Sequence, residues 1–126
     1  MSTLTLLRDQ LAVCRLPPAA AIPEWATSGP FFSVIRTHAE LSVVCVENLA
    51  PPGVVCEAGW RAFEVAGPLD FSLTGVLAAI AAPLAAAGVS IFAISSFDTD
   101  YVLVKVGDLG KAIAALSAAG HEVAIS

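Results

Sequence analysis

The stretch from Gly75 to Ile94 constrains the fold more than any other, because its 20 residues carry no charge. Its length would allow a membrane span. Its character changes at Gly88, however, from alanine and leucine at helical spacing to the valine, isoleucine and phenylalanine usage of a strand. Pro83 interrupts the run, and no basic flank sets an orientation in a bilayer. A helix followed by a buried strand therefore explains the run better than a membrane span.

The helix predicted within this run has a single apolar face. Its apolar side chains recur at the spacing of helical turns: Leu73, Val76, Leu77, Ile80 and Leu84. A predicted strand, Arg61 to Ala66, precedes it, and the turn from Gly67 to Gly75 offers Asp70 or Ser72 as N-cap. Gly88 supplies a left-handed stop. This segment therefore reads as strand, turn and helix.

The remainder of the chain completes a βαββαβ order. Val89 to Ser95 and Tyr101 to Val106 are β-rich runs, and the short polar segment 96–100 between them is typical of a hairpin. A second helix is predicted to begin after the cap Asp108 and to end at Gly120. Its apolar face carries Leu109, Ile113 and Leu116. Glu122 to Ile125 forms the last strand. Right-handed crossovers then give a ferredoxin-like α+β fold, with two helices on one face of an antiparallel sheet.

The first half of the chain reads as a shortened copy of the second. At a constant offset of sixty residues, Phe32 to Glu47 matches Phe92 to Gly107, with Glu40 over Asp100, and both segments have the pattern of a hairpin. We therefore predict two parts, a degenerate half at 1–58 that shares or extends the sheet and a complete domain at 59–126.

The helices of the first copy are nearly lost. Gln10 to Leu16 reads as a strand, and Pro23 to Ala26 has room for a single helical turn. Asn48 to Gly59 contains Pro51, Pro52 and Gly53, which break a second helix, so we interpret it as the connection between the halves.

Composition favours a subunit interface and argues against polyanionic partners. Hydrophobic residues make up 57% of the chain against 13% charged, more apolar surface than so short a chain can hide, so we expect a homodimer. The net charge of -5 comes without a lysine or arginine cluster, which argues against nucleic acid and anionic membranes as partners. The N-terminal residues lack the pattern of a secretory signal, so the expected location is cytoplasmic.

The three cysteines, Cys14, Cys45 and Cys56, stand far apart without metal-ligand or redox-motif spacing. Each lies in a valine-rich or leucine-rich setting. We predict buried thiols that act as small hydrophobic side chains, in keeping with a reducing compartment.

The residues also carry a family resemblance. Asp70, followed by Thr74 to Leu77 and Ile80, resembles the strand-to-helix turn of ACT domains. The segment from Gly59 to Lys105, together with Glu40 to Cys45, is similar to the tandem ACT proteins related to the CASTOR arginine sensors and their small bacterial counterparts. The resemblance covers about residues 10 to 126. It implies paired ACT units whose sheets join, with an amino acid bound between units near the first turn.

Topology and the resemblance indicate one candidate ligand site. The first two strands of a βαββαβ sheet run parallel, so the turn before the first helix and the hairpin at 96–100 emerge at one end. Asp70, Asp98 and Asp100 could hold an ammonium there, and the helix N-terminus could receive a carboxylate. The resemblance places ligand contacts at matching positions in both halves: Asp70, Phe71, Ser72, Ser96, Phe97, Asp100, Ser42 and Val43. The same polar residues are common as plain helix caps and turn residues.

Other chemistries have weaker support. Asp98 and Asp100 resemble a metal-binding pair but lack a third ligand, and no nucleophile motif accompanies His38 or His121. We therefore predict no metal, no cofactor and no catalytic residue. The expected function is a non-catalytic regulatory protein that binds an amino acid and signals to a separate effector. The alternative is a structural or dimerisation module without a ligand.

Overall fold

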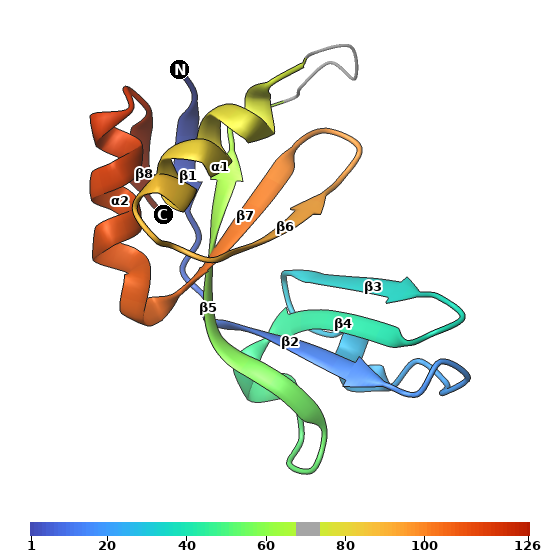
Figure 1. The fold of residues 1–126 in the computed structure, drawn as a ribbon. Helices are drawn as coiled ribbons and strands as arrows, with labels where there is room; N and C mark the ends of the chain where they lie inside the picture. The colour runs from blue at the N-terminus through green and yellow to red at the C-terminus, as the bar shows by residue number, and fades with distance from the viewer. Residues whose placement is uncertain (68–73) are drawn as a thin grey trace. The chain divides into compact units, whose positions relative to one another are not determined.

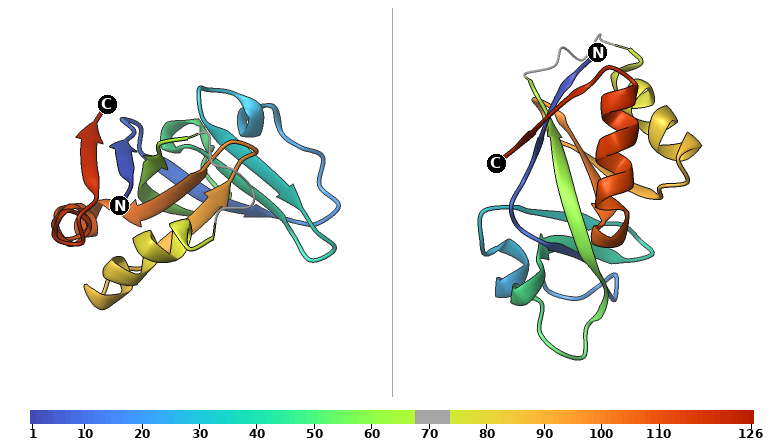
Figure 2. Two further views of the ribbon diagram at one scale, coloured as in Figure 1. Left: turned by 90° about the horizontal axis from the view of Figure 1, so that it is seen from above. Right: turned by 90° about the vertical axis from the view of Figure 1, so that its left-hand side faces the viewer.

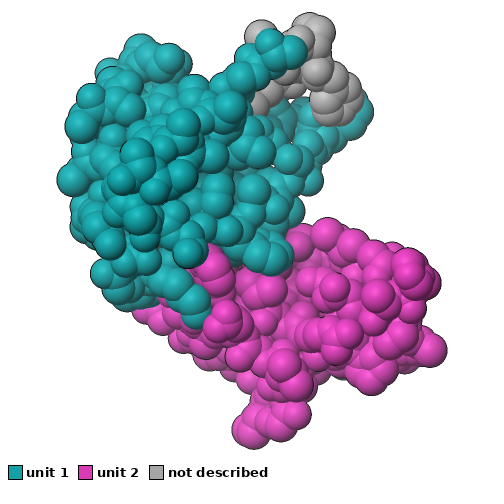
Figure 3. Space-filling model, in the orientation of Figure 1, with its two compact units in different colours: residues 1–8, 61–126 teal, residues 9–60 magenta. Residues whose placement is uncertain are grey.

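The computed structural model describes residues 1–67 and 74–126, which form two compact units (Figure 3). Unit 1 consists of Met1–Arg8 and Arg61–Ser126, and unit 2 consists of Asp9–Trp60. The first eight residues thus belong with the second half of the chain.

Unit 1 contains the predicted βαββαβ order with one added strand (Figure 1). Its elements are β1 (Thr3–Leu6), the second half of β5 (Val55–Val65), α1 (Val76–Ala86), β6 (Ile91–Ser95), β7 (Asp100–Lys105), the short 3-10 helix η3 (Val106–Asp108), α2 (Leu109–Ala118) and β8 (Glu122–Ile125). The strands pair in the order β8-β1-β5-β7-β6. Strand β1 lies parallel to β8 and antiparallel to β5. It is therefore inserted between the first and last strands of a ferredoxin-like sheet.

Both helices pack on one face of this sheet, as Figure 2 shows. The core is apolar and fully or almost fully buried, with Leu4, Phe63 and Val102 from the strands and Ile80 and Leu116 from the helices. Leu77, Leu109 and Ile113 are partly buried against it. Among the described residues, no helix is long and apolar enough to cross a membrane.

Both helices end where the sequence predicts, but the first helix begins at a different residue. Gly88 and Gly120 have φ of 75° and 90°, the left-handed conformation predicted for the stops. Helix α1 begins at Val76, and its N-cap is Gly75, with φ of 78°, in place of the predicted Asp70 or Ser72. A glycine takes that conformation without the steric penalty of a side chain. The helix can therefore begin after Gly75 without a side-chain cap.

Unit 2 has the same strand order with its helices reduced to single turns. Its elements are β2 (Leu11–Leu16), the 3-10 helix η1 (Glu24–Thr27), β3 (Phe32–Arg36), β4 (Leu41–Val46), the 3-10 helix η2 (Glu47–Leu49) and the first half of β5. The pairing order β3-β4-β2-β5 is that of a ferredoxin-like sheet. The prediction of a continuous connection from Asn48 to Gly59 was wrong, because β5 begins at Val55, soon after Pro51, Pro52 and Gly53.

The two hairpins repeat at an offset of 59 residues rather than sixty. Arg36 faces Leu41 in one and Ser95 faces Asp100 in the other, so matching positions differ by 59 (95 − 36 and 100 − 41). The turns agree as well, since the Thr37 amide donates to the Glu40 carbonyl and the Ser96 amide to the Thr99 carbonyl. Glu40 therefore corresponds to Thr99, not to Asp100. An error of one residue in the alignment exchanges the two faces of a strand. The sequence does not reveal this error, because these strands carry apolar residues on both faces.

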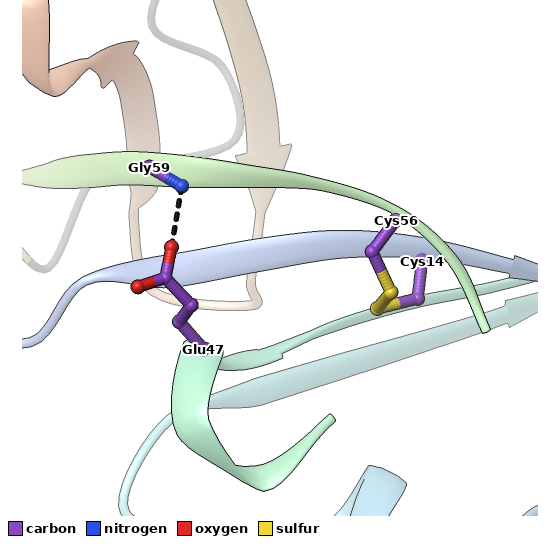
Figure 4. Close-up of a disulfide and its surroundings, with 4 residues drawn as sticks. All are labelled: Cys14, Glu47, Cys56 and Gly59. Atoms are coloured by element: carbon purple, nitrogen blue, oxygen red, sulfur yellow. Dashed lines mark hydrogen bonds between the residues drawn. A yellow bond between two sulfur atoms is a disulfide. The ribbon is translucent and has the colours of Figure 1, made fainter. Parts of the chain in front are cut away.

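Two of the three cysteines are not the free thiols that the sequence predicted. Cys14 on β2 stands directly opposite Cys56 on β5, and a disulfide joins them (Figure 4). Cys45 is a buried free thiol, as expected. The prediction failed because 42 residues separate the bonded pair and only the pairing of β2 with β5 brings them together.

Candidate ligand-binding site at the turn between β6 and β7

The turn between β6 and β7 is hydrogen-bonded to the end of β5. The Ser96 amide donates to the Thr99 carbonyl at 2.8 Å, and the Ser96 hydroxyl accepts from the Thr99 amide at 3.3 Å. The hydroxyl of Thr99 donates to the carbonyl oxygen of Val65 at 2.6 Å, and this side chain is buried. The turn is thus held against the point where β5 ends.

Three of the residues predicted from the sequence meet in this turn. The carboxylate of Asp100 accepts a hydrogen bond of 2.6 Å from the Ser95 hydroxyl, its cross-strand neighbour. Ser96 forms the turn, and the Phe97 side chain at its tip is 80% exposed. Asp100 is half-buried and Asp98 is exposed. The turn therefore brings Ser96, Phe97 and Asp100 together, and their binding of a ligand stays a prediction.

Two residues beside this turn, Glu64 and Tyr101, were not predicted from the sequence. The Tyr101 hydroxyl donates to Oε2 of Glu64 at 3.0 Å. Burial, the hydrogen bond to Glu64 and the charges of Glu64 and Asp98 raise the pKa of Tyr101, and a hydrogen bond with Ser96 opposes them. The phenol therefore stays a hydrogen-bond donor. The sequence did contain a signal for Glu64, which is a charged residue between the buried Phe63 and Val65. Alternation along β5 points its side chain to the face of the sheet that the helices do not cover.

The other predicted residues do not join this cluster among the described residues. Asp70, Phe71 and Ser72 lie outside the described part of the chain. Ser42 and Val43 lie on β4 of unit 2, where Ser42 is half-buried and faces Arg15 across the ladder. The Val43 side chain is completely buried in the core of unit 2. Packing in this core is sufficient to explain why a valine occupies position 43.

The chemistry available at the turn is that of acceptors. Glu64 and Asp98 both act on the Tyr101 hydroxyl, whereas Asp100 shares the other face of β7 with Val102 and bonds to Ser95. Each carboxylate favours a cationic group such as an ammonium. The exposed ring of Phe97 can cover apolar atoms or a cation. Within residues 1–67 and 74–126, no group of three or more histidine, cysteine, aspartate or glutamate residues is arranged to hold a metal ion.

The fold and the comparisons identify the class of protein. A βαββαβ sheet with two helices on one face makes unit 1 a ferredoxin-like α+β module. A model of the ACT domain matches residues 55–118, and a model of a separate N-terminal domain matches residues 9–52. The chain therefore belongs to the ACT domain family.

Curated relatives carry the name cytosolic arginine sensor for mTORC1 subunit 1. The protein from Bos taurus is 32% identical over 126 residues, covering 89% of this chain and 37% of its own length. The Homo sapiens protein is 43% identical over 58 residues, covering 45% of this chain and 18% of its own. The chain spans about a third of the length of the first relatives it matches.

Solved structures show the same fold. A crystallised protein from Agobacterium tumefaciens is 38% identical with a TM-score of 0.94, covering 99% of this chain and 93% of its own. A Vibrio cholerae protein has a TM-score of 0.77 at 21% identity, covering 94% of this chain and 89% of its own. The regulatory subunit of aspartate kinase from Thermus thermophilus has a TM-score of 0.63 at 13% identity, covering 89% and 93%.

Proposed function

We propose that this chain is a non-catalytic regulatory ACT protein that binds a free amino acid at the turn between β6 and β7. The observation that carries the proposal is the anchoring of this turn by Thr99, whose hydroxyl bonds to Val65 at the end of β5. Anchoring holds the carboxylates in place before a ligand arrives, which lowers the entropy lost on binding. Asp98 and Asp100 then receive the ammonium of the amino acid.

The other parts of the amino acid are assigned to residues of matching chemistry. Phe97 packs on its apolar part, and residues 70–72 remain the predicted contacts for its carboxylate. Ser42, half-buried on β4, remains a predicted contact, whereas the Val43 side chain packs in the core of unit 2. An amino acid held between ACT units would shift an equilibrium between assembly states, and a separate effector protein would receive the signal.

Relatives support a regulatory role. The names of the curated relatives describe a cytosolic arginine sensor, and one structural neighbour is the regulatory subunit of a kinase. The same relationship supports a cytoplasmic location and an absence of catalysis.

A homodimer is part of the proposal. Unit 1 exposes large apolar side chains, among them Phe97 at 80%, Ile125 at 74% and Val106 at 41%. Such residues are common at subunit interfaces. Light scattering at micromolar concentration should report twice the monomer mass, and a monomer would contradict this part of the proposal.

Calorimetric titration with a panel of amino acids tests the ligand. Asp98→Asn and Asp100→Asn should each weaken binding by about 1.5 to 3 kcal/mol, because each removes the charge from a hydrogen bond to the ammonium. Asp108→Asn is the matched control, since this aspartate begins α2 and its carboxylate lies 3.6 Å from Lys111 Nζ. It should leave affinity unchanged. If no amino acid binds the parent protein at millimolar concentration, the sensor proposal fails and a dimerisation module without a ligand takes its place.

A further inference from the structure

We propose that Cys14 and Cys56 form a reversible thiol–disulfide site that locks the first half of β5 onto β2. The two residues are partners in the antiparallel ladder, with Cα atoms 4.1 Å apart. Their disulfide encloses the whole β3–β4 hairpin of unit 2. Neither the family relationship nor the candidate ligand site assigns a role to this pair.

The bridge lies beyond an irregularity in the ladder. Leu11 faces Trp60 and Val13 faces Glu57, so β5 carries one extra residue between these two pairs. Gly59, with φ of 79°, supplies the left-handed residue at this bulge. Beyond it the ladder to β2 continues as a short run centred on the cysteines. The bridge is therefore placed where strand pairing has just been interrupted.

The start of β5 is exposed to solvent. The preceding residues Pro51, Pro52 and Gly53 are exposed, and the Val55 side chain is 71% exposed. A strand end with little buried apolar surface opens locally at low free energy. A covalent tie in the middle of such a segment has a large effect on its opening, so oxidation and reduction should change the order of residues 50–58.

A second anchor keeps the change local (Figure 4). Oε1 of Glu47 accepts a hydrogen bond of 2.6 Å from the Gly59 amide, and Oε2 accepts one of 3.0 Å from Nε2 of Gln10. These bonds hold the bulge whether or not the sulfurs are joined. The segment that can open therefore ends at Gly59.

The two sulfurs differ in solvent exposure, and this difference determines which sulfur a reductant attacks first. Cys14 is 1% exposed, whereas Cys56 is half-buried beside exposed residues. A thiolate of a dithiol reductant attacks the Cys56 sulfur, and Cys14 leaves as a thiolate that takes a proton. The second thiol of the reductant then attacks the mixed disulfide and releases Cys56. Two electrons pass to the protein, and the reductant becomes a disulfide. Oxidised glutathione re-forms the bond: the Cys56 thiolate attacks it and releases one reduced glutathione, and the Cys14 thiolate then attacks Cys56 in the mixed disulfide and releases the second.

Cys45 is close in the core and does not compete. It belongs to the same apolar cluster as Cys14 and Cys56 and is completely buried. Burial raises the pKa of the Cys45 thiol. Since the thiolate is the reacting form, this cysteine stays a thiol, and it provides a matched control.

Counting thiols tests the bond itself. The protein is purified without reductant, unfolded, and alkylated with iodoacetamide before mass spectrometry. We expect one modified cysteine, Cys45, and a linked pair of peptides containing Cys14 and Cys56. After treatment with dithiothreitol, all three cysteines should be modified. Alkylation of all three without the reductant would overturn the proposal.

Hydrogen exchange of the oxidised and reduced parent protein tests the lock. Reduction should speed amide exchange at residues 55–58 by about tenfold or more and leave α2 unchanged. Equal exchange at 55–58 in both states would overturn the proposal, even if the bond forms. Cys45→Ala should keep the full response, and Cys56→Ser should exchange like the reduced protein under both conditions. Loss of the response in Cys45→Ala would also contradict it. The parent protein supplies both states, so the test does not depend on any variant folding.

Discussion

His121 donates a hydrogen bond from Nε2 to the carbonyl oxygen of Ala79 in α1, at 2.9 Å. Four residues further along the helix stands Pro83, which has no amide hydrogen to give that carbonyl. Nδ1 of the same ring accepts from the Ser2 amide at 3.0 Å, so the ring proton must be on Nε2. The buried histidine thus replaces a helical hydrogen bond and ties α1 to the start of β1.

His121→Phe should destabilise the protein by about 1 to 3 kcal/mol in urea unfolding, because it leaves the part-buried Ser2 amide and Ala79 carbonyl without their partner. In the Pro83→Ala background the loss should be smaller by about 1 kcal/mol, since the alanine amide can then bond to Ala79. Equal losses in both backgrounds would show that the proline and the histidine are independent.

Two positions on α2 should differ in their contribution to the core. Leu116 is completely buried, whereas Ile113 is only partly buried against the same cluster. Leu116→Ala should therefore lower the free energy of unfolding by about 2 to 5 kcal/mol, and Ile113→Ala by about 1 to 2 kcal/mol. The sequence places both residues on the apolar face of this helix without distinguishing them, so equal losses of stability in the two variants would contradict the difference in burial.

The raised pKa of Tyr101 makes stability depend on alkaline pH. A tyrosine in an unfolded chain ionises near about pH 10. The folded state keeps the proton to higher pH, so this contribution to stability is present below about pH 10 and is lost as the pH rises through the pKa of the folded protein. Tyr101→Phe should flatten the decline measured by urea unfolding between about pH 9 and 11.

The titration can also be observed directly. Tyr101 is the only tyrosine in the chain, so phenolate absorbance reports on it alone. Glu64→Gln should move that titration toward lower pH, because it removes a negative charge beside the hydroxyl. An unchanged titration would contradict the Tyr101–Glu64 contact.

Two glycines should respond to alanine with opposite signs. Gly59 has φ of 79° and Gly110 lies inside α2, and in both cases an added Cβ meets no atom within 4 Å. Gly59→Ala should destabilise by about 1 to 2 kcal/mol because of its left-handed conformation. Gly110→Ala should stabilise by about 0.5 to 1 kcal/mol because it restricts the unfolded chain. Calorimetric melting of the pair compares them, and stabilisation by both would show that the bulge tolerates an L-residue.

Local features of this protein follow from the sequence by itself. The apolar spacing of Ile80 and Leu84, the stops at Gly88 and Gly120, and the hairpin around Ser96 depend on residues a few positions apart. Helical periodicity and turn chemistry act at that range. The order βαββαβ and the turn between β6 and β7 could therefore be predicted before the structure, and the ACT family was indicated by resemblance to its strand-to-helix turn.

The tertiary structure decided how distant segments pair. The insertion of β1 between β8 and β5, the pairing of Cys14 with Cys56, and the approach of Glu64 to Tyr101 join residues tens of positions apart. Alternating side chains restrict a strand to one face but do not choose its neighbour or its exact pairing, because many apolar strands in this chain could bury similar surface. That choice depends on burial and hydrogen bonding summed over a whole sheet, and it becomes definite only when all the strands are in place.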